Sequence, residues 1–100
     1  MSKRRNIITI CDCPAPTVEV DPGAGAMYVR FRRGKVARTE ADTRPDGIFI
    51  GVDFNAAGEV MGVEFVGGDE LKITAVLKAA RVRVKNLRVA DMAVKLTPAS

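Results

Sequence analysis

The chain has 100 residues, of which 47% are hydrophobic and 28% charged, with a net charge of +4, two cysteines and no histidine. This length and mixed composition predict one domain over residues 1–100 and exclude a fibrous or obviously disordered chain. No apolar run approaches the ~20 residues of a membrane helix, and two cysteines are too few for a disulfide-stabilised scaffold.

The first residues predict a basic tail followed by a short strand. Residues 1–6 contain three Lys or Arg, and Asp12 ends the following apolar stretch after about five residues, short of the ~7–15 of a signal peptide. We therefore expect a cytoplasmic protein that does not bind membranes. Cys11 and Cys13 supply only half of a usual four-ligand metal set, so we expect neither a metal site nor a cofactor.

Most of the next fifty residues alternate apolar and polar side chains, which is typical of strands with one buried face. Turn residues such as Asp21-Pro22-Gly23 separate the alternating stretches. The predicted strands are 17–20, 26–33, 35–41, 47–54 and 60–66. In the last of these, Met61 should lie on the inner face with Val63, and Val60 on the outer face. Short connections favour antiparallel hairpins.

The pattern changes after Gly67-Gly68. Asp69 and Glu70 suit a helix start, because carboxylates are stabilised at the positive end of the helix dipole, and the apolar spacing is partly helical as far as Ala80. From residue 81 the period returns to two, which predicts a strand over 81–86, and residues 87–97 are compatible with two further strands.

These elements predict an α+β fold: an antiparallel β-meander of about four strands, one covering helix and a C-terminal strand extension. The family-like core spans 17–80, the basic tail 1–6 and the extension 81–100. A sheet with one apolar face must bury that face, and one short helix covers only part of it. We therefore expect a homodimer whose interface is the inner face. The residues of that face are Met27, Val29, Phe31, Ile50, Val52, Val63 and Phe65.

Charge is distributed in blocks along the chain. Residues 1–39 carry a net +5, residues 40–70 a net −7 and residues 71–100 a net +6. The simpler interpretation is scatter over solvated strand faces, and the alternative is a basic patch that contacts nucleic acid. A total excess of four positive charges does not by itself demand the second.

Four groups of residues stand in a characteristic order along the middle of the chain. They are Asp21-Pro22, then Ala26-Met27-Tyr28-Val29-Arg30, then Gly47-Ile48 with Val52-Asp53, and finally Gly58-Glu59-Val60 with Gly62-Val63-Glu64-Phe65. In this order residues 21–67 resemble a family of small bacterial domains catalogued as domain of unknown function 2283. The resemblance implies a small β-rich, self-associating domain and no activity, and it makes an antitoxin-type role conceivable.

Polar and aromatic side chains of three predicted strands fall opposite the predicted core: Tyr28, Arg30, Arg32, Phe49, Asp53 and Glu64. In a meander Arg30 would lie near Asp53 or Glu64, and Gly62 would leave a gap in which a neighbouring side chain could lie. The simpler interpretation is a solvated ladder of ion pairs, each worth roughly 0.2–1 kcal/mol. The alternative is a polar site in which Arg30 binds an anion and Tyr28 or Phe49 offers a stacking surface.

We expect no catalytic residue. General acid–base catalysis near neutral pH most often uses histidine, which is absent. Asp53 and Glu64 could pair as acid and base, but nothing in the sequence signals a shifted pKa. The glycine-rich turns at 21–25 and 66–69 lack the lysine and Ser/Thr of a phosphate-binding loop.

The sequence thus predicts a non-catalytic protein-interaction or structural module, homodimeric through its inner face. One alternative is a regulator, antitoxin-like, that contacts nucleic acid, and another is a stoichiometric inhibitor of a different protein. Nucleic acid is possible but not favoured. The residues predicted for basic contact are Arg33, Lys35, Arg81, Arg83 and Lys85.

Overall fold

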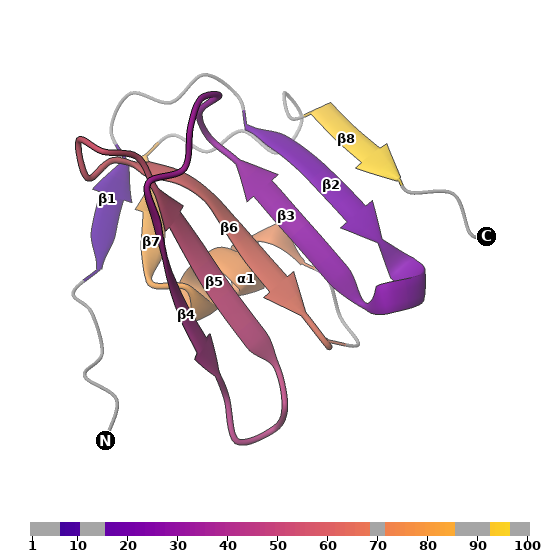
Figure 1. Ribbon diagram of the computed structural model, residues 1–100. Helices are drawn as coiled ribbons and strands as arrows, with labels where there is room; N and C mark the ends of the chain where they lie inside the picture. The colour runs from indigo at the N-terminus through magenta and orange to yellow at the C-terminus, as the bar shows by residue number, and fades with distance from the viewer. Residues whose placement is uncertain (1–6, 11–15, 69–71, 86–92, 97–100) are drawn as a thin grey trace.

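The computed structural model describes residues 7–10, 16–68, 72–85 and 93–96 (Figure 1). The elements in chain order are β1 (Ile8–Ile10), β2 (Thr17–Asp21), η1 (Pro22–Ala24), β3 (Ala26–Arg30), β4 (Arg38–Thr43), β5 (Phe49–Phe54), β6 (Val60–Val66), α1 (Ile73–Ala79), β7 (Val82–Val84) and β8 (Ala93–Leu96). The predicted tail 1–6, Cys11, Cys13, the predicted helix start at Asp69 and Glu70, and residues 86–92 lie outside the described residues.

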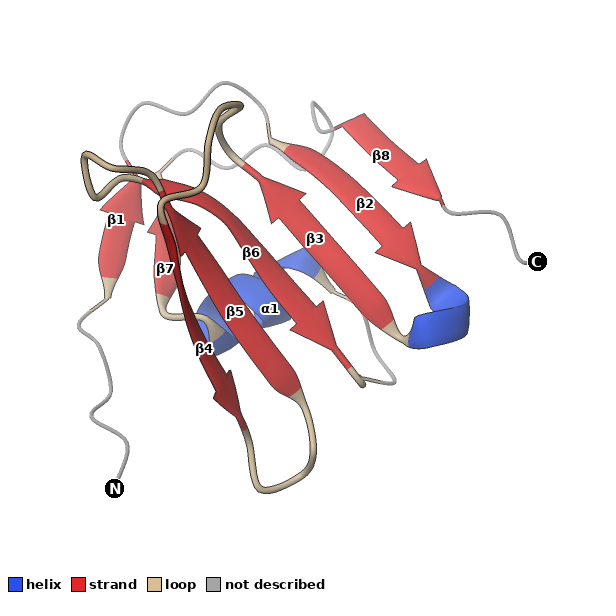
Figure 2. Ribbon diagram, in the orientation of Figure 1, coloured by secondary structure: helices blue, strands red, loops and turns tan. Residues whose placement is uncertain are grey.

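Six strands form one sheet in the order β4-β5-β6-β3-β2-β8, while β1 and β7 form a separate parallel pair (Figures 1 and 2). The strands from β4 to β2 are antiparallel neighbours, and β8 runs parallel to β2. The predicted small, mostly-sheet domain with one helix is confirmed. β4, β5 and β6 follow one another as a meander, but β3 lies beside β6 instead of β4, which is the order of a Greek key.

Apolar residues match across the β3–β6 pair. Met27 lies opposite Phe65 and Val29 opposite Val63, so both strands contribute to the same buried face. Beyond the end of β3, the amides of Phe31 and Arg32 both donate to the Met61 carbonyl, at 2.9 and 3.2 Å. Contact with β6 therefore continues past the strand end, although β3 itself is shorter than the predicted 26–33.

A second layer made of α1, β1 and β7 lies against one face of the sheet (Figure 2). From this layer the core takes Ile10, Val76, Leu77, Ala80 and Val82. The sheet residues predicted for the inner face are all buried, at 8% exposure or less: Met27, Val29, Phe31, Ile50, Val52, Val63 and Phe65. The predicted alternation is confirmed, but this face is closed within one chain. The prediction that it forms the homodimer interface is therefore wrong, and a dimer would need another surface.

A bulge interrupts the pairing of β5 with β6. Asp53 pairs with Gly62 and Phe54 with Val60, which leaves Met61 as the extra residue. Val60 joins the core at 3% exposure, whereas Met61, also 3% exposed, is buried outside the core cluster. The sequence predicted the opposite, with Met61 on the inner face and Val60 on the outer face. That prediction fails because one inserted residue reverses the alternation of faces beyond it.

A residue with an unusual backbone conformation follows helix α1, two positions after its last residue, Ala79. Arg81 adopts a left-handed φ of 58° and donates its amide to the Lys78 carbonyl at 3.1 Å. Glycine takes this conformation at little cost, whereas a residue with a Cβ loses roughly 1–2 kcal/mol. The turn leads the chain directly from α1 into β7. Over the part of the chain that the structure describes, no helix has the length and apolarity needed to cross a membrane.

Candidate functional site

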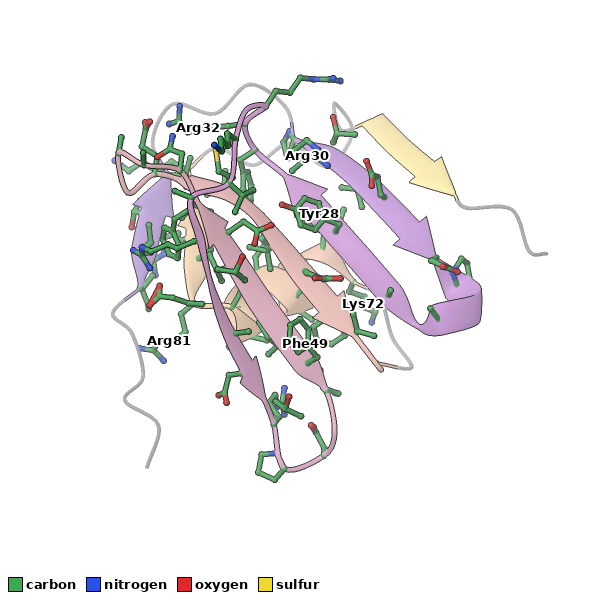
Figure 3. The ribbon with its side chains drawn as sticks, in the orientation of Figure 1. Tyr28, Arg30, Arg32, Phe49, Lys72 and Arg81 are labelled. Atoms are coloured by element: carbon green, nitrogen blue, oxygen red, sulfur yellow. The ribbon has the colours of Figure 1, made fainter. Side chains whose placement is uncertain are left out.

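The face of the sheet opposite the core, here called the open face, carries most of the predicted polar surface (Figure 3). Tyr28 lies between Glu19 of β2 and Glu64 of β6, and Gly62 lies between Arg30 and Asp53. Five predicted residues share this face: Tyr28, Arg30, Phe49, Asp53 and Glu64. The sixth, Arg32, lies beyond the end of β3 and forms an ion pair with Glu59 at 3.0 Å.

The Tyr28 side chain crosses Gly62 and reaches β5, where its hydroxyl donates to Asp53 Oδ2 at 2.7 Å. A Cβ at residue 62 would overlap the Tyr28 hydroxyl and lie 2.5 Å from Cζ, so only glycine leaves room for the ring. The predicted gap at Gly62 is confirmed, and Tyr28 occupies it. Thr39 of β4 donates its hydroxyl to the other Asp53 oxygen at 2.5 Å. Both oxygens of this carboxylate therefore accept hydrogen bonds from within the chain.

Arg30 is directed toward β2 instead of toward the acids of β5 and β6. Its guanidinium forms an ion pair with Glu19 at 3.9 Å and lies 5.1 Å from the centre of the Tyr28 ring. The predicted pairing of Arg30 with Asp53 or Glu64 is therefore wrong. The hydrogen-bonding position on Asp53 nearest β3 is taken by the Tyr28 hydroxyl, and Arg30 pairs with Glu19 of the neighbouring strand β2.

Partial burial raises the pKa of Tyr28 well above its ordinary value of 10.0, and the hydrogen bond to Asp53 and the charge of Asp53 act in the same direction. The nearby Arg30 guanidinium lowers it, but by less. The phenol therefore stays protonated and acts as a hydrogen-bond donor. This is the opposite of the lowered pKa that would activate a tyrosine as a base or nucleophile.

Among the described side chains, the open face is acidic around the Arg30 guanidinium. The register places Glu19, Asp21, Asp53 and Glu64 on the same face as Arg30. Four carboxylates would repel a phosphate, and the guanidinium already contacts Glu19 and the Tyr28 ring. This environment argues against the predicted anion site at Arg30. Stacking on Tyr28 is disfavoured too, since Gly62 and Arg30 already contact its ring.

The residues predicted for basic contact fall into two groups. Arg33 and Lys35 are exposed in the connection from β3 to β4, whereas Arg81, Arg83 and Lys85 lie on or beside β7. Figure 3 shows Arg32, at the start of that connection, well apart from Arg81.

Two residues of the second group, Arg81 and Arg83, border a hollow of about 380 Å³ between α1 and the β1–β7 pair. We call it the basic hollow and define it by its lining residues: Ile7, Thr74, Leu77, Lys78, Arg81, Val82, Arg83 and Val84. The alternating pattern predicted Arg81 and Arg83 for basic contact but not Lys78. The helical spacing of Thr74, Lys78 and Arg81 was the available signal, since residues three and four apart share one face of a helix.

Among the described residues, no group of three or more cysteine, aspartate or glutamate side chains is arranged to hold a metal ion. Comparison of the chain with protein-family models, curated proteins and solved structures found no match. The resemblance of residues 21–67 to the family of small bacterial domains therefore stays a prediction.

The ionisation of Tyr28 can be measured directly, because the chain has one tyrosine and no tryptophan. We expect the ultraviolet absorbance of phenolate to rise near pH 10 in denaturant and only at higher pH in the native protein. Because the folded pKa is the higher one, this group's contribution to stability is complete below pH ~10 and is lost as the pH rises above it.

The variant Asp53→Asn separates the causes of this shift. Removing the carboxylate should lower the pKa of Tyr28 toward its ordinary value while the burial of the ring remains. Equal titration midpoints for the native and denatured protein would contradict the Tyr28–Asp53 contact.

Proposed function

We propose that the protein is a non-catalytic interaction module that forms a homodimer by pairing two copies of the edge strand β4. The observation that carries the proposal is that β4 is an exposed edge strand of the sheet. Within the described part of the chain, β4 pairs with β5 alone, and all six of its residues are exposed (Figure 1). An edge strand presents unpaired N–H and C=O groups that can pair with another chain.

The polar network of the open face supports a non-catalytic role. Asp53 accepts hydrogen bonds from Tyr28 and Thr39 at its two oxygens, and the pKa of Tyr28 is raised. These side chains cross-link β3, β4 and β5, and such satisfied networks add rigidity to a sheet. The network therefore favours a structural contribution of Asp53 over acid–base chemistry.

Charge at the edge favours a protein partner over nucleic acid. β4 carries Glu40 and Asp42 against the single cation Arg38, and the adjoining open face is acidic. Such a surface repels phosphate groups. Contact with nucleic acid through the predicted basic residues, and stoichiometric inhibition of another protein through the same edge, stay predictions.

The backbone pattern of β4 identifies the groups that would pair. The Arg44 amide donates to the Ile48 carbonyl at 2.8 Å. Antiparallel pairing alternates along a strand, so the amides of Asp42 and Glu40 face β5, and that of Ala41 faces outward. Two copies paired antiparallel about Glu40 would place Arg38 of each opposite Asp42 of the other, which gives two opposite-charge pairs against one Glu40–Glu40 pair at the centre. Pairing about Ala41 would instead place Glu40 of each copy opposite Asp42 of the other. This register has two like-charge pairs and no opposite-charge pair along β4 to compensate for their repulsion.

The variant Ala41→Pro tests this dimer, since proline removes the outward amide and is tolerated on edge strands. We expect sedimentation velocity to show a dimer for the wild-type protein and a dissociation constant at least ~10-fold higher for the variant, a change of about 1.4 kcal/mol. The circular dichroism of the fold should be retained, because the amides that face β5 are untouched.

The variant Ala56→Pro is the matched control. Ala56 is the second residue of the turn that Gly58 closes by donating to the Asn55 carbonyl at 3.0 Å, a position where proline fits. This variant should dimerise like the wild type. A wild-type monomer at every concentration would refute the dimer, and an Ala41→Pro variant that still dimerises would refute the β4 interface.

A further inference from the structure

The basic hollow combines an apolar floor with a cationic border. Leu77 and Val82 are each 4% exposed, Val84 is partly buried, and Ile7 is 53% exposed, one of the most exposed large hydrophobic side chains described. The volume of about 380 Å³ lies within the ~300–1,000 Å³ range of small-molecule sites, which are mainly apolar with a few polar groups that orient the ligand.

Three cations border this floor, and none of the described residues that line it carries a carboxylate. Lys78 and Arg83 are exposed, and Arg81 lies at the turn from α1 to β7 (Figure 3). The carbonyls of Val76 and Lys78 at the end of α1 already accept backbone amides. The acidic open face lies on the other side of the sheet, so its carboxylates do not offset this positive charge.

We propose that the basic hollow binds a small amphipathic anion, in which a carboxylate or phosphate head is joined to an apolar chain. The chain lies on Leu77, Val82 and Val84, and the head contacts Lys78 and Arg83 at the surface. Charge complementarity selects the anion, and the apolar floor selects a ligand with a hydrocarbon body. A polyanion such as nucleic acid would use the cations but leave the floor unfilled.

NMR chemical-shift titration of the full chain with octanoate tests this site. We expect saturable shifts, one ligand per chain, centred on the amides of residues 77–78 and 82–84. Octanol lacks the charge and acetate lacks the chain, so each should bind at least ~10-fold more weakly than octanoate. The same titration with octyl phosphate distinguishes the two head groups.

Charge-reversed variants test the cationic border. The double variant Lys78→Glu with Arg83→Glu alters two exposed side chains and should weaken octanoate at least ~10-fold while octanol binding is unchanged. The single variant Lys35→Glu reverses an exposed charge in the β3–β4 connection, outside the hollow, and should bind octanoate like the wild type. Ile7→Ser should weaken octanoate and octanol together.

Three results would overturn the proposal. They are octanoate shifts that do not saturate, equal affinities for the wild type and the charge-reversed variant, and binding of a DNA duplex at these residues without binding of octanoate. The last result would assign the cations to nucleic acid, with affinity that falls steeply with salt. This site is separate from the β4 edge, so the Ala41→Pro variant should keep its octanoate affinity whether or not the dimer exists.

Discussion

Replacing Phe54 with alanine is expected to lower the free energy of unfolding by about 3–5 kcal/mol, the largest effect we predict for a single substitution. Phe54 is 1% exposed and is one of the largest fully buried side chains. It ends β5 at the bulge and pairs there with Val60. Small domains are stable by ~5–15 kcal/mol, so the variant should lose a large share of its stability. Urea unfolding followed by circular dichroism measures this loss.

Two variants calibrate the result. Phe54→Leu keeps most of the apolar volume and should cost roughly 1–1.5 kcal/mol. Val36→Ala removes apolar atoms from a side chain that is 42% exposed and should change stability by less than about 0.5 kcal/mol. A cost near that of Val36→Ala for Phe54→Ala would show that α1, β1 and β7 do not close over this end of the sheet.

The second large effect is expected at Gly62. Gly62→Ala places a Cβ where the Tyr28 ring lies, so the ring must move and the hydroxyl must leave Asp53. We expect a loss of about 1–3 kcal/mol in the free energy of unfolding. The direction opposes intrinsic preference, since alanine is less costly than glycine in a strand.

A double-mutant cycle identifies the cause. In a Tyr28→Ala background the same Gly62→Ala change should be nearly neutral, with a coupling energy of about 1–2 kcal/mol. Gly51→Ala provides a graded comparison, because its Cβ would lie 3.2 Å from Phe49 Cε1, a milder approach that a small shift of the ring relieves. Additive effects of Gly62→Ala and Tyr28→Ala would contradict the packing of the ring on Gly62.

The sequence was sufficient to predict which side chains are buried wherever local alternation is undisturbed. Met27 and Val29 face inward because strand geometry alone sends alternate side chains to opposite faces. The same reasoning could not identify the neighbour of β3. An apolar strand face fits several partners equally well, so the choice of β6 over β4 depends on the whole sheet.

The errors in the predicted site have a similar origin. Met61 is an extra residue only because β6 pairs with β5 on both sides of it, and this extra residue reverses which side chains face the core. The sequence alone does not show that pairing. At the polar site, the opposite charges of the side chains and their spacing along the strands favoured an ion pair between Arg30 and Asp53 or Glu64. The sequence predicted the gap at Gly62, but it did not identify Tyr28 as the side chain that fills it, because the alternation of charges fits several neighbours.

The central position of β6 has a consequence for synthesis of the chain. The hairpin of β2 and β3 leaves the ribosome before β6 does, so one long edge of β3 stays open until residues 60–66 have also emerged. Pairing of segments so distant along a nascent polypeptide is slow, and its exposed backbone meanwhile invites contact with other chains. Fragments that stop before β6 should therefore precipitate or be captured by chaperones instead of folding.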